Sequence, residues 1–185
     1  MLLATLVAGL CAEGETWHLL IEPTFMHYET SWPIVGAQRT VLVPARLVNG
    51  ELLPLRRSEA MTVTREKILE SAPQAASAVL AELKPRFIRD ENNVIQCAVL
   101  ESSSPLTASA VLAPEFAATF SDTIGPDLLV AIPNRFRIFV FPKVSPAYRR
   151  FSDIVIAEYD SSPYPVSKEL FSLRKGKLIA IGSYR

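Results

Sequence analysis

The strongest constraint on the fold is the stretch from Gly125 to Gly182, which opens GPDLLVAIPNRFRIFVFP and closes on LFSLRKGKLIAIG. The apolar run after Asp127 does not alternate with polar residues, a pattern typical of a strand that is covered on both faces. A helical segment with one polar face follows at Ser145. Turn chemistry, periodicity and length therefore predict one local architecture here, namely strand, turn, strand, helix and hairpin.

The second strand of this block predicts a sheet that separates two apolar layers. Successive side chains of a strand point to opposite faces, and we expect the preceding turn at Pro133 to Arg135. In the returning strand only Arg137 interrupts the two apolar faces, which carry Phe136, Ile138 and Val140 on one side and Phe139 and Phe141 on the other.

Short strands are also expected earlier in the chain, at residues 16–22 and in two hairpins. Asn49 and Gly50 supply the two positive-φ residues of a type I′ turn between strands at 40–48 and 51–55. Because proline cannot donate to a ladder, Pro44 and Pro54 predict that this hairpin lies at a sheet edge or forms an arm. The second hairpin fits residues 86–90 and 94–100.

Helix signals occur in three places. Thr64 as a cap, Pro73 at a second start and Pro85 as a stop predict two consecutive short helices. Residues 114–124 predict a further helix that ends at Gly125-Pro126. Ser145 and Pro146 start a helix whose charges oppose the helix dipole, since Arg149 and Arg150 lie early and Glu158 and Asp160 lie late.

These patterns predict an α+β fold with a mixed, mainly antiparallel sheet of short strands and hairpins packed with about four to five helices. The 185 residues are enough for a single domain, 1–185, without a disulfide or metal staple. Two sub-lobes fit the pattern, a hairpin-rich one at 1–101 and a second one at 105–185. The serine-rich stretch 101–104 is the best candidate for a linker between them.

Composition narrows the class of partner. Nineteen basic and nineteen acidic residues give a formal net charge of +0, so no long-range field draws the protein to nucleic acid, which we do not expect as a partner. Hydrophobic residues make up 49% of the chain, so much of it must be buried, in part against a partner copy. We therefore expect self-association or binding to another protein.

The first twelve residues, MLLATLVAGLCA, are apolar. They lack a basic start and are too short to span a bilayer, which takes about 20 residues. We expect a first helix packed on the core of a cytoplasmic protein, with export through an atypical signal as the alternative. Cys11 and Cys97 lie in apolar contexts and are expected to be reduced and buried.

The search for catalytic motifs is negative. With only seven glycines the chain has no Gly-rich phosphate loop. His18, His27 and Glu22 have loose spacing for a metal site, and no metal is expected. No spacing singles out a nucleophile with its base or a pair of catalytic carboxylates. We therefore expect no cofactor and assign no catalytic residue.

One group of basic residues suggests a ligand-binding site. Between Leu128 and Ser152 there are five cations and no acid. If they converge near a helix start, they could hold an anion through charge-assisted hydrogen bonds. The alternative is that Arg149 pairs with Asp153 and the other cations are solvated. The candidate anion-binding residues are Arg137, Lys143, Ser145, Arg149 and Arg150.

The helix that ends at Gly125, the block DLLVAIPNRFRIFVFP, the next helix and PVSKELFSLRKGKLIAIG together resemble the C-terminal part of the YtpQ-like family, a bacterial domain of unknown function. TVTREKILE and the alanine-rich segment after it are similar to the middle of that family. The likeness covers roughly residues 62–182 and consists of hydrophobic patterns and turns. It implies an α+β fold and a cytoplasmic bacterial protein, and it assigns no functional residues.

Two functions fit these observations. The first is a non-catalytic interaction or regulatory module that associates with itself, suggested by the apolar composition and the lack of a catalytic set. The alternative is a domain that binds a small anionic molecule, or an unrecognised hydrolase, at the basic residues 135–150.

Overall fold

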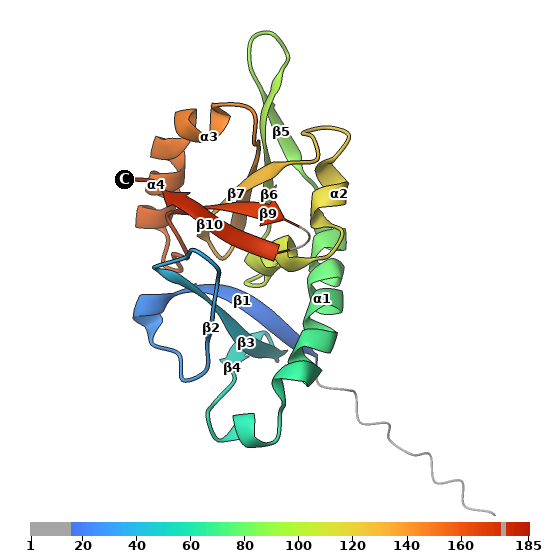
Figure 1. The fold of residues 1–185 in the computed structure, drawn as a ribbon, viewed down its shortest axis with the longest axis vertical. Coiled ribbons are helices and arrows are strands. Elements are labelled where there is room, and N and C mark those ends of the chain that lie inside the picture. Colours follow the sequence, from blue (N-terminus) through green and yellow to red (C-terminus); the bar gives the residue numbers. More distant parts are fainter. Residues whose placement is uncertain (1–15, 175–176) are drawn as a thin grey trace, which may run out of the picture.

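Residues 16–174 and 177–185 are described in this computed structural model, and they form two antiparallel sheets with helices packed around them (Figure 1). The predicted α+β class is confirmed. The strands are β1 (Trp17–Pro23), β2 (Trp32–Pro33), β3 (Thr40–Val48), β4 (Glu51–Pro54), β5 (Arg86–Arg89), β6 (Ile95–Glu101), β7 (Leu128–Asn134), β8 (Arg137–Pro142), β9 (Glu169–Arg174) and β10 (Lys177–Ser183). The α-helices are α1 (Arg65–Glu82), α2 (Phe116–Phe120), α3 (Ala147–Arg150) and α4 (Ser152–Ser161), and the 3-10 helices are η1 (Thr24–Met26), η2 (Glu59–Met61) and η3 (Thr107–Leu112).

Sheet A consists of β1, β3 and β2 in that order, with β4 also paired to β3. Sheet B has the order β10-β9-β7-β8-β6-β5. In Figure 1, sheet B with α2, α3 and α4 occupies the upper part of the molecule, sheet A the lower part, and α1 runs along one side. The β5–β6 hairpin projects from the top.

Sheet B is covered on both faces, as the apolar strands predict. Ile138 and Val140 of β8 point into a core shared with α1, α2 and η3. Phe139 and Phe141 point to the other side, where Ala147 of α3 and Val155 of α4 pack on them. The chain in β7 and β8 can therefore be apolar on both sides without exposing hydrophobic surface.

A single long helix replaces the two short helices predicted between Thr64 and Pro85. Thr64 caps it as expected, because its hydroxyl accepts a hydrogen bond from the backbone N–H of Lys67. Pro73 lies inside the helix and removes one backbone hydrogen bond. The helix continues past Pro73 because its small buried residues Ala72, Ala75 and Ala76 pack closely on both sides of that position.

The Asn49-Gly50 hairpin is confirmed. Both residues have positive φ, 52° and 82°, and Ala45 faces Pro54. The expectation that the hairpin lies at a sheet edge is wrong for β3, which has β1 on one side and β2 and β4 on the other. The carbonyl of Pro44 accepts from the backbone N–H of Leu55, so the missing donor of Pro44 also faces the β4 side, where β4 has ended. Pro44 therefore costs β1 no hydrogen bond.

Three local expectations in the second half of the chain are corrected. The β7–β8 turn consists of Arg135 and Phe136, because β7 continues through Asn134. The helix expected over 114–124 is regular only in α2. The helix after Ser145 is interrupted at Phe151, whose φ of −90° and ψ of 4° separate α3 from α4.

This interruption explains the charges that oppose a continuous helix. Arg149 and Arg150 lie in the last turn of α3, where a cation is favourable, and Asp153 lies in the first turn of α4, where an anion is favourable. Glu158 and Asp160, near the end of α4, form ion pairs with Arg137 and Lys168.

Sheets A and B are joined at the edge of β10. The backbone N–H of Ala180 donates to the carbonyl of Val35, and a Cβ built on Gly36 would lie 2.4 Å from the Ala180 carbonyl oxygen. Next to this contact, the buried Glu169 carboxylate accepts from the backbone N–H of Gln38 at 2.7 Å and from the hydroxyl of Thr40 at 2.5 Å. These contacts fix the loop before β3 against β9 and β10.

The expectations for residues 1–12 and for Cys11 lie outside the described residues. Cys97 is buried in sheet B, as expected. Within residues 16–174 and 177–185, no helix has the length and apolar character needed to cross a membrane.

Candidate functional site

The structure does not bring the five predicted anion-binding residues together. Arg137 begins β8 and Lys143 follows its end. The six residues of β8 separate their backbones by about 20 Å at about 3.3 Å per residue. The predicted band is therefore divided between two ends of sheet B.

Arg137 is occupied by acidic partners. Its guanidinium donates to Glu158 through Nη1 and lies 2.8 Å from a Glu101 carboxylate oxygen through Nη2. Both acids line the same pocket of about 470 Å³ as Arg137. One cation between two carboxylates leaves this pocket with a net negative charge, which does not favour an anion.

At the other end, the structure separates Arg149 from its neighbours. The hydroxyl of Ser145 accepts from the backbone N–H of Ala147 and so completes the local turn. Lys143, Arg149 and Arg150 are all exposed, and neither Lys143 nor Arg150 lines any of the pockets described below. Arg149 alone of the five lines a pocket that lacks acidic side chains.

This pocket, which we call the Arg149 pocket, lies between the α3–α4 junction and the end of β10. Its volume is about 480 Å³, within the range of small-molecule sites. A bulge between Ala180 and Gly182 in β10 precedes it, and the backbone N–H of Tyr184 donates to the Lys168 carbonyl, which holds the chain end beside α4. The pocket is lined by Tyr148, Arg149, Ser152, Leu170, Ile181, Gly182, Ser183, Tyr184 and Arg185.

Arg149 is held at the rim of the pocket by the residue before it. Its Nε donates to the Tyr148 hydroxyl at 3.1 Å, and its guanidinium carbon lies 5.5 Å from the centre of the Tyr148 ring. Among the described residues, its two terminal amino groups have no carboxylate partner, and the alternative pairing with Asp153 is not formed. A guanidinium with these two groups available can bind a carboxylate or phosphate bidentately.

The rest of the lining adds a second cation and an apolar wall. Arg185 also lines the pocket, so its side chains carry two positive charges and no negative one. Leu170 is buried and Ile181 is half exposed. Burial, with Tyr148 and Cys97 nearby, raises the pKa of Tyr184, which therefore stays neutral at physiological pH. Such a lining suits an anionic group attached to an apolar or aromatic part.

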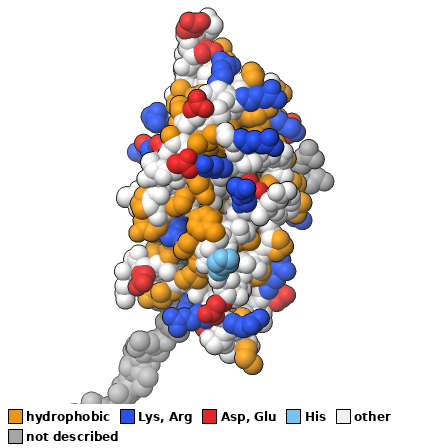
Figure 2. Space-filling model, turned by 90° about the vertical axis from the view of Figure 1, so that its left-hand side faces the viewer, with side chains coloured by type: hydrophobic (Ala, Val, Ile, Leu, Met, Phe, Trp, Pro, Cys, Tyr) orange, Lys and Arg blue, Asp and Glu red, His pale blue; other side chains and the backbone are white. Residues whose placement is uncertain are grey.

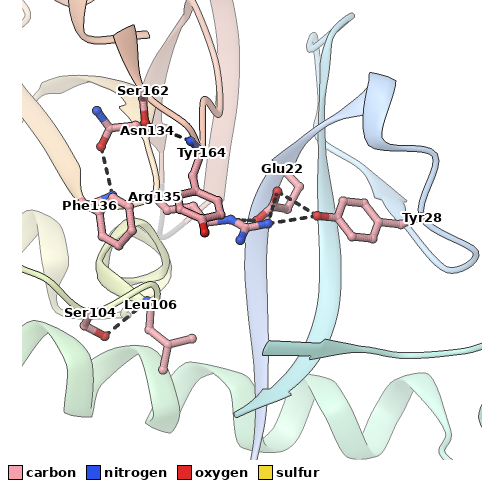
Figure 3. A network of polar contacts seen from close by, with 9 residues as sticks. All are labelled: Glu22, Tyr28, Ser104, Leu106, Asn134, Arg135, Phe136, Ser162 and Tyr164. Atoms are coloured by element: carbon pink, nitrogen blue, oxygen red, sulfur yellow. Dashed lines mark hydrogen bonds and ion pairs between the residues drawn. The ribbon is translucent and has the colours of Figure 1, made fainter. Parts of the chain in front are cut away.

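Arg135, the cation at the β7–β8 turn, is paired with an acidic side chain of sheet A. Figure 3 shows Arg135 reaching from this turn to Glu22 of β1 and the Tyr28 hydroxyl. Its guanidinium carbon also lies 5.3 Å from the centre of the Tyr164 ring. Burial alone would lower the pKa of Arg135, but the hydrogen bonds and charge of Glu22 outweigh it and raise this pKa. Arg135 is therefore a charged link between the sheets.

Metal and thiol chemistry find no support in the described part of the chain. No group of three or more His, Cys, Asp or Glu side chains there could hold a metal ion. Burial lowers the pKa of His18, and it raises the pKa of the Cys97 thiol to about 12. The Cys97 thiol is therefore protonated at neutral pH, and the thiolate is the reactive form.

Sequence reasoning named Arg149 as a candidate but missed the residues that line the pocket beside it. Tyr148 precedes Arg149 directly, so an aromatic ring beside the cation was visible in the sequence. Tyr184 and Arg185 come from the far end of the chain, and only the bulge in β10 and the position of α4 bring them close. No local pattern indicates that approach.

No protein-family model, no curated protein and no solved structure matches this chain. The resemblance to the YtpQ-like family therefore stays a prediction, and the site rests on its geometry alone.

Proposed function

We propose that this protein binds a small anionic molecule, or an anionic group of a larger one, in the Arg149 pocket. The observation that carries the proposal is the Arg149 guanidinium, which Tyr148 positions at the rim while its terminal amino groups have no acidic partner among the described residues. Arg185 provides a second positive charge in the same lining. Of the basic residues at 135–150 that the sequence suggested as an anion site, the proposal keeps only Arg149.

The chemistry of the pocket supports binding through one end of the ligand. A carboxylate or phosphate would accept charge-assisted hydrogen bonds from Arg149, and an apolar part would contact Leu170 and Ile181. Arg149 itself is exposed, but the apolar part of the lining, which includes the buried Leu170, excludes water from one side of a bound ligand and so strengthens these hydrogen bonds.

Thermal unfolding with and without ligand tests this proposal. Inorganic phosphate and a panel of phosphorylated metabolites are added to the protein, and a ligand that binds the folded state raises its Tm in a saturable way. We expect Arg149→Ala to abolish the rise. The matched control is Arg150→Ala, which removes the neighbouring cation outside the lining of the Arg149 pocket. Equal loss in both variants would contradict a site at Arg149.

Self-association stays a separate prediction. Exposed hydrophobic side chains at Val35 and Ile181 lie at the edge strand β10, which the bridge between Val35 and Ile179 covers only locally, and they could contact a second copy. Light scattering on the purified protein tests this, and a strict monomer at all concentrations would contradict it.

A further inference from the structure

A second pocket lies along the same side of α4 as the Arg149 pocket, and we call the surface that carries both pockets the groove. Ser152 lines the Arg149 pocket, and Tyr159 lines a second pocket of about 370 Å³. These residues are seven positions apart in α4, about two helical turns, so they point to the same side and lie about 10 Å apart along the helix. The second pocket, which we call the Arg39 pocket, is lined by Pro23, Thr24, Phe25, Arg39, Tyr159, Val166, Ser167 and Lys168.

The start of β9 also borders both pockets. Lys168, at the bend before β9, lines the Arg39 pocket, and Leu170, two residues later in β9, lines the Arg149 pocket. The Lys168 carbonyl accepts from the backbone N–H of Tyr184, so the backbones that border the two pockets are in contact.

The Arg39 pocket, like the Arg149 pocket, combines an arginine with an apolar side chain. Arg39 is exposed, and within the described part of the chain its side chain has no carboxylate partner. Lys168, in contrast, is neutralised by Asp160 at 2.7 Å and lies over the Tyr159 ring. Apolar contact is offered by Phe25, whose side chain is 53% exposed at the rim.

The face that carries α3, α4 and the C-terminal end is turned toward the reader in Figure 2. Hydrophobic side chains gather along the middle of this face, and basic side chains, with a smaller number of acidic ones, lie beside them. Such a surface suits a partner that brings negative charge and apolar side chains together.

We propose that the natural ligand of this groove is an extended acidic segment of another polypeptide, with one carboxylate at Arg149 and a second at Arg39. This inference rests on the proposed anion site at Arg149 and adds the second subsite and the class of partner. Ser152 and Tyr159, which line the two pockets, are about 10 Å apart along α4, a distance that about three residues of extended chain span at about 3.3 Å each. A peptide with acidic residues a few positions apart can therefore present one of them to each pocket.

A peptide fits this surface better than a phosphate polymer does. The half-exposed side chains of Phe25 and Ile181 lie at opposite ends of the groove and provide contacts that only an apolar side chain would use. The net charge of +0 also gives the whole protein no general attraction to polyanions. A peptide that carries carboxylates between apolar side chains uses the apolar contacts and does not depend on a general attraction to polyanions.

The test measures binding of four probes by titration calorimetry. The first is a hexapeptide of alternating glutamate and leucine, the second replaces each glutamate by glutamine, the third is inorganic phosphate and the fourth is linear tripolyphosphate. The variants are Arg39→Ala, Arg149→Ala and, as the matched control, Arg150→Ala. Unfolding curves of all variants establish that each is folded at the temperature of the titration.

We expect Arg39→Ala to weaken the acidic peptide about tenfold, the size of one lost hydrogen bond to a charged group, and to leave phosphate binding unchanged. Arg149→Ala should weaken binding of the acidic peptide and of phosphate, and Arg150→Ala neither. The inference is overturned if Arg39→Ala leaves peptide binding unchanged, if the glutamine peptide binds as tightly, or if linear tripolyphosphate binds more tightly than the acidic peptide. If the proposed anion site at Arg149 is itself wrong, phosphate binding will be insensitive to Arg149→Ala. This result distinguishes the two failures.

Discussion

Arg135 donates two hydrogen bonds to Glu22, from Nε to Oε1 at 2.7 Å and from Nη2 to Oε2 at 3.0 Å. The two residues are 113 positions apart in the chain, and their pairing joins β1 of sheet A to the β7–β8 turn of sheet B. The Glu22 side chain is 2% exposed and that of Arg135 is 16% exposed, so water screens this pair little. Neither charge has a second acidic or basic partner in the described part of the chain.

We predict that Glu22→Ala lowers the free energy of unfolding by about 3 kcal/mol, because it leaves the Arg135 guanidinium largely buried and unpaired. The control is Asp160→Asn, which breaks an ion pair whose acidic side chain is 56% exposed and should cost at most about 1 kcal/mol. Urea denaturation of the two variants measures both effects. Equal losses would show that the Glu22–Arg135 pair does not hold the sheets together.

Gly36 is predicted to tolerate no side chain. Its φ is +78°, and an added Cβ would lie 2.4 Å from the Ala180 carbonyl oxygen, so Gly36→Ala meets both backbone strain and a clash. Gly50→Ala is the matched control, since its φ is +82° but no atom lies within 4 Å of the added Cβ. We expect Gly50→Ala to cost about 1 to 2 kcal/mol of stability and Gly36→Ala to cost clearly more. Similar costs in denaturation experiments would contradict the close contact between residue 36 and β10.

Tyr28 predicts a loss of stability at alkaline pH. Burial first, then the Glu22 charge, raises the pKa of Tyr28 from 10.0 to about 12. Between about pH 10 and pH 12 the folded state therefore holds a proton that the unfolded chain has released, and stability falls as the pH rises through this window. Tyr28→Phe removes this contribution, so its Tm should fall less steeply over the same range. A parallel fall in both proteins would contradict the raised pKa.

Cys97 is predicted to resist thiol reagents. Burial raises the pKa of its thiol to about 12, and the side chain lies in the core of sheet B. In a Cys11→Ser background, we expect labelling by a disulfide reagent at about pH 8 to be at least about a hundredfold slower in the folded protein than in urea. Rapid labelling of the folded protein would contradict the placement of Cys97 in the core.

The parts of the fold that the sequence predicts are those that local chemistry determines. Asn49-Gly50 forces a tight hairpin, and the alternation in β8 separates two apolar layers. The break at Phe151 has no such signal, because neither glycine nor proline occurs there. It follows from packing, since Phe151 contacts Phe139 and Phe141 of sheet B. The same break places Arg149 at the end of α3.

The candidate site was also predictable only in part, because the acidic partners of its cations come from distant elements. A run of cations without acids identifies residues 135–150 as basic, but it does not show which cation meets an acid from a distant element. Glu158 reaches Arg137 from α4, and Glu22 reaches Arg135 from β1. These long-range pairs remove two arginines from the candidate site, whereas Arg149 has no carboxylate partner among the residues that the structure describes.

The central claim is that Arg149, and not the neighbouring cations Lys143 and Arg150, binds the anion. The most direct measurement follows the side-chain Nε–Hε signals of the arginines by NMR while inorganic phosphate is added. The account predicts that the signals of Arg149 and Arg185 move together and saturate with one dissociation constant, while that of Arg150 moves little. Equal, non-saturating shifts at all exposed arginines, or an unchanged Arg149 signal, would contradict it.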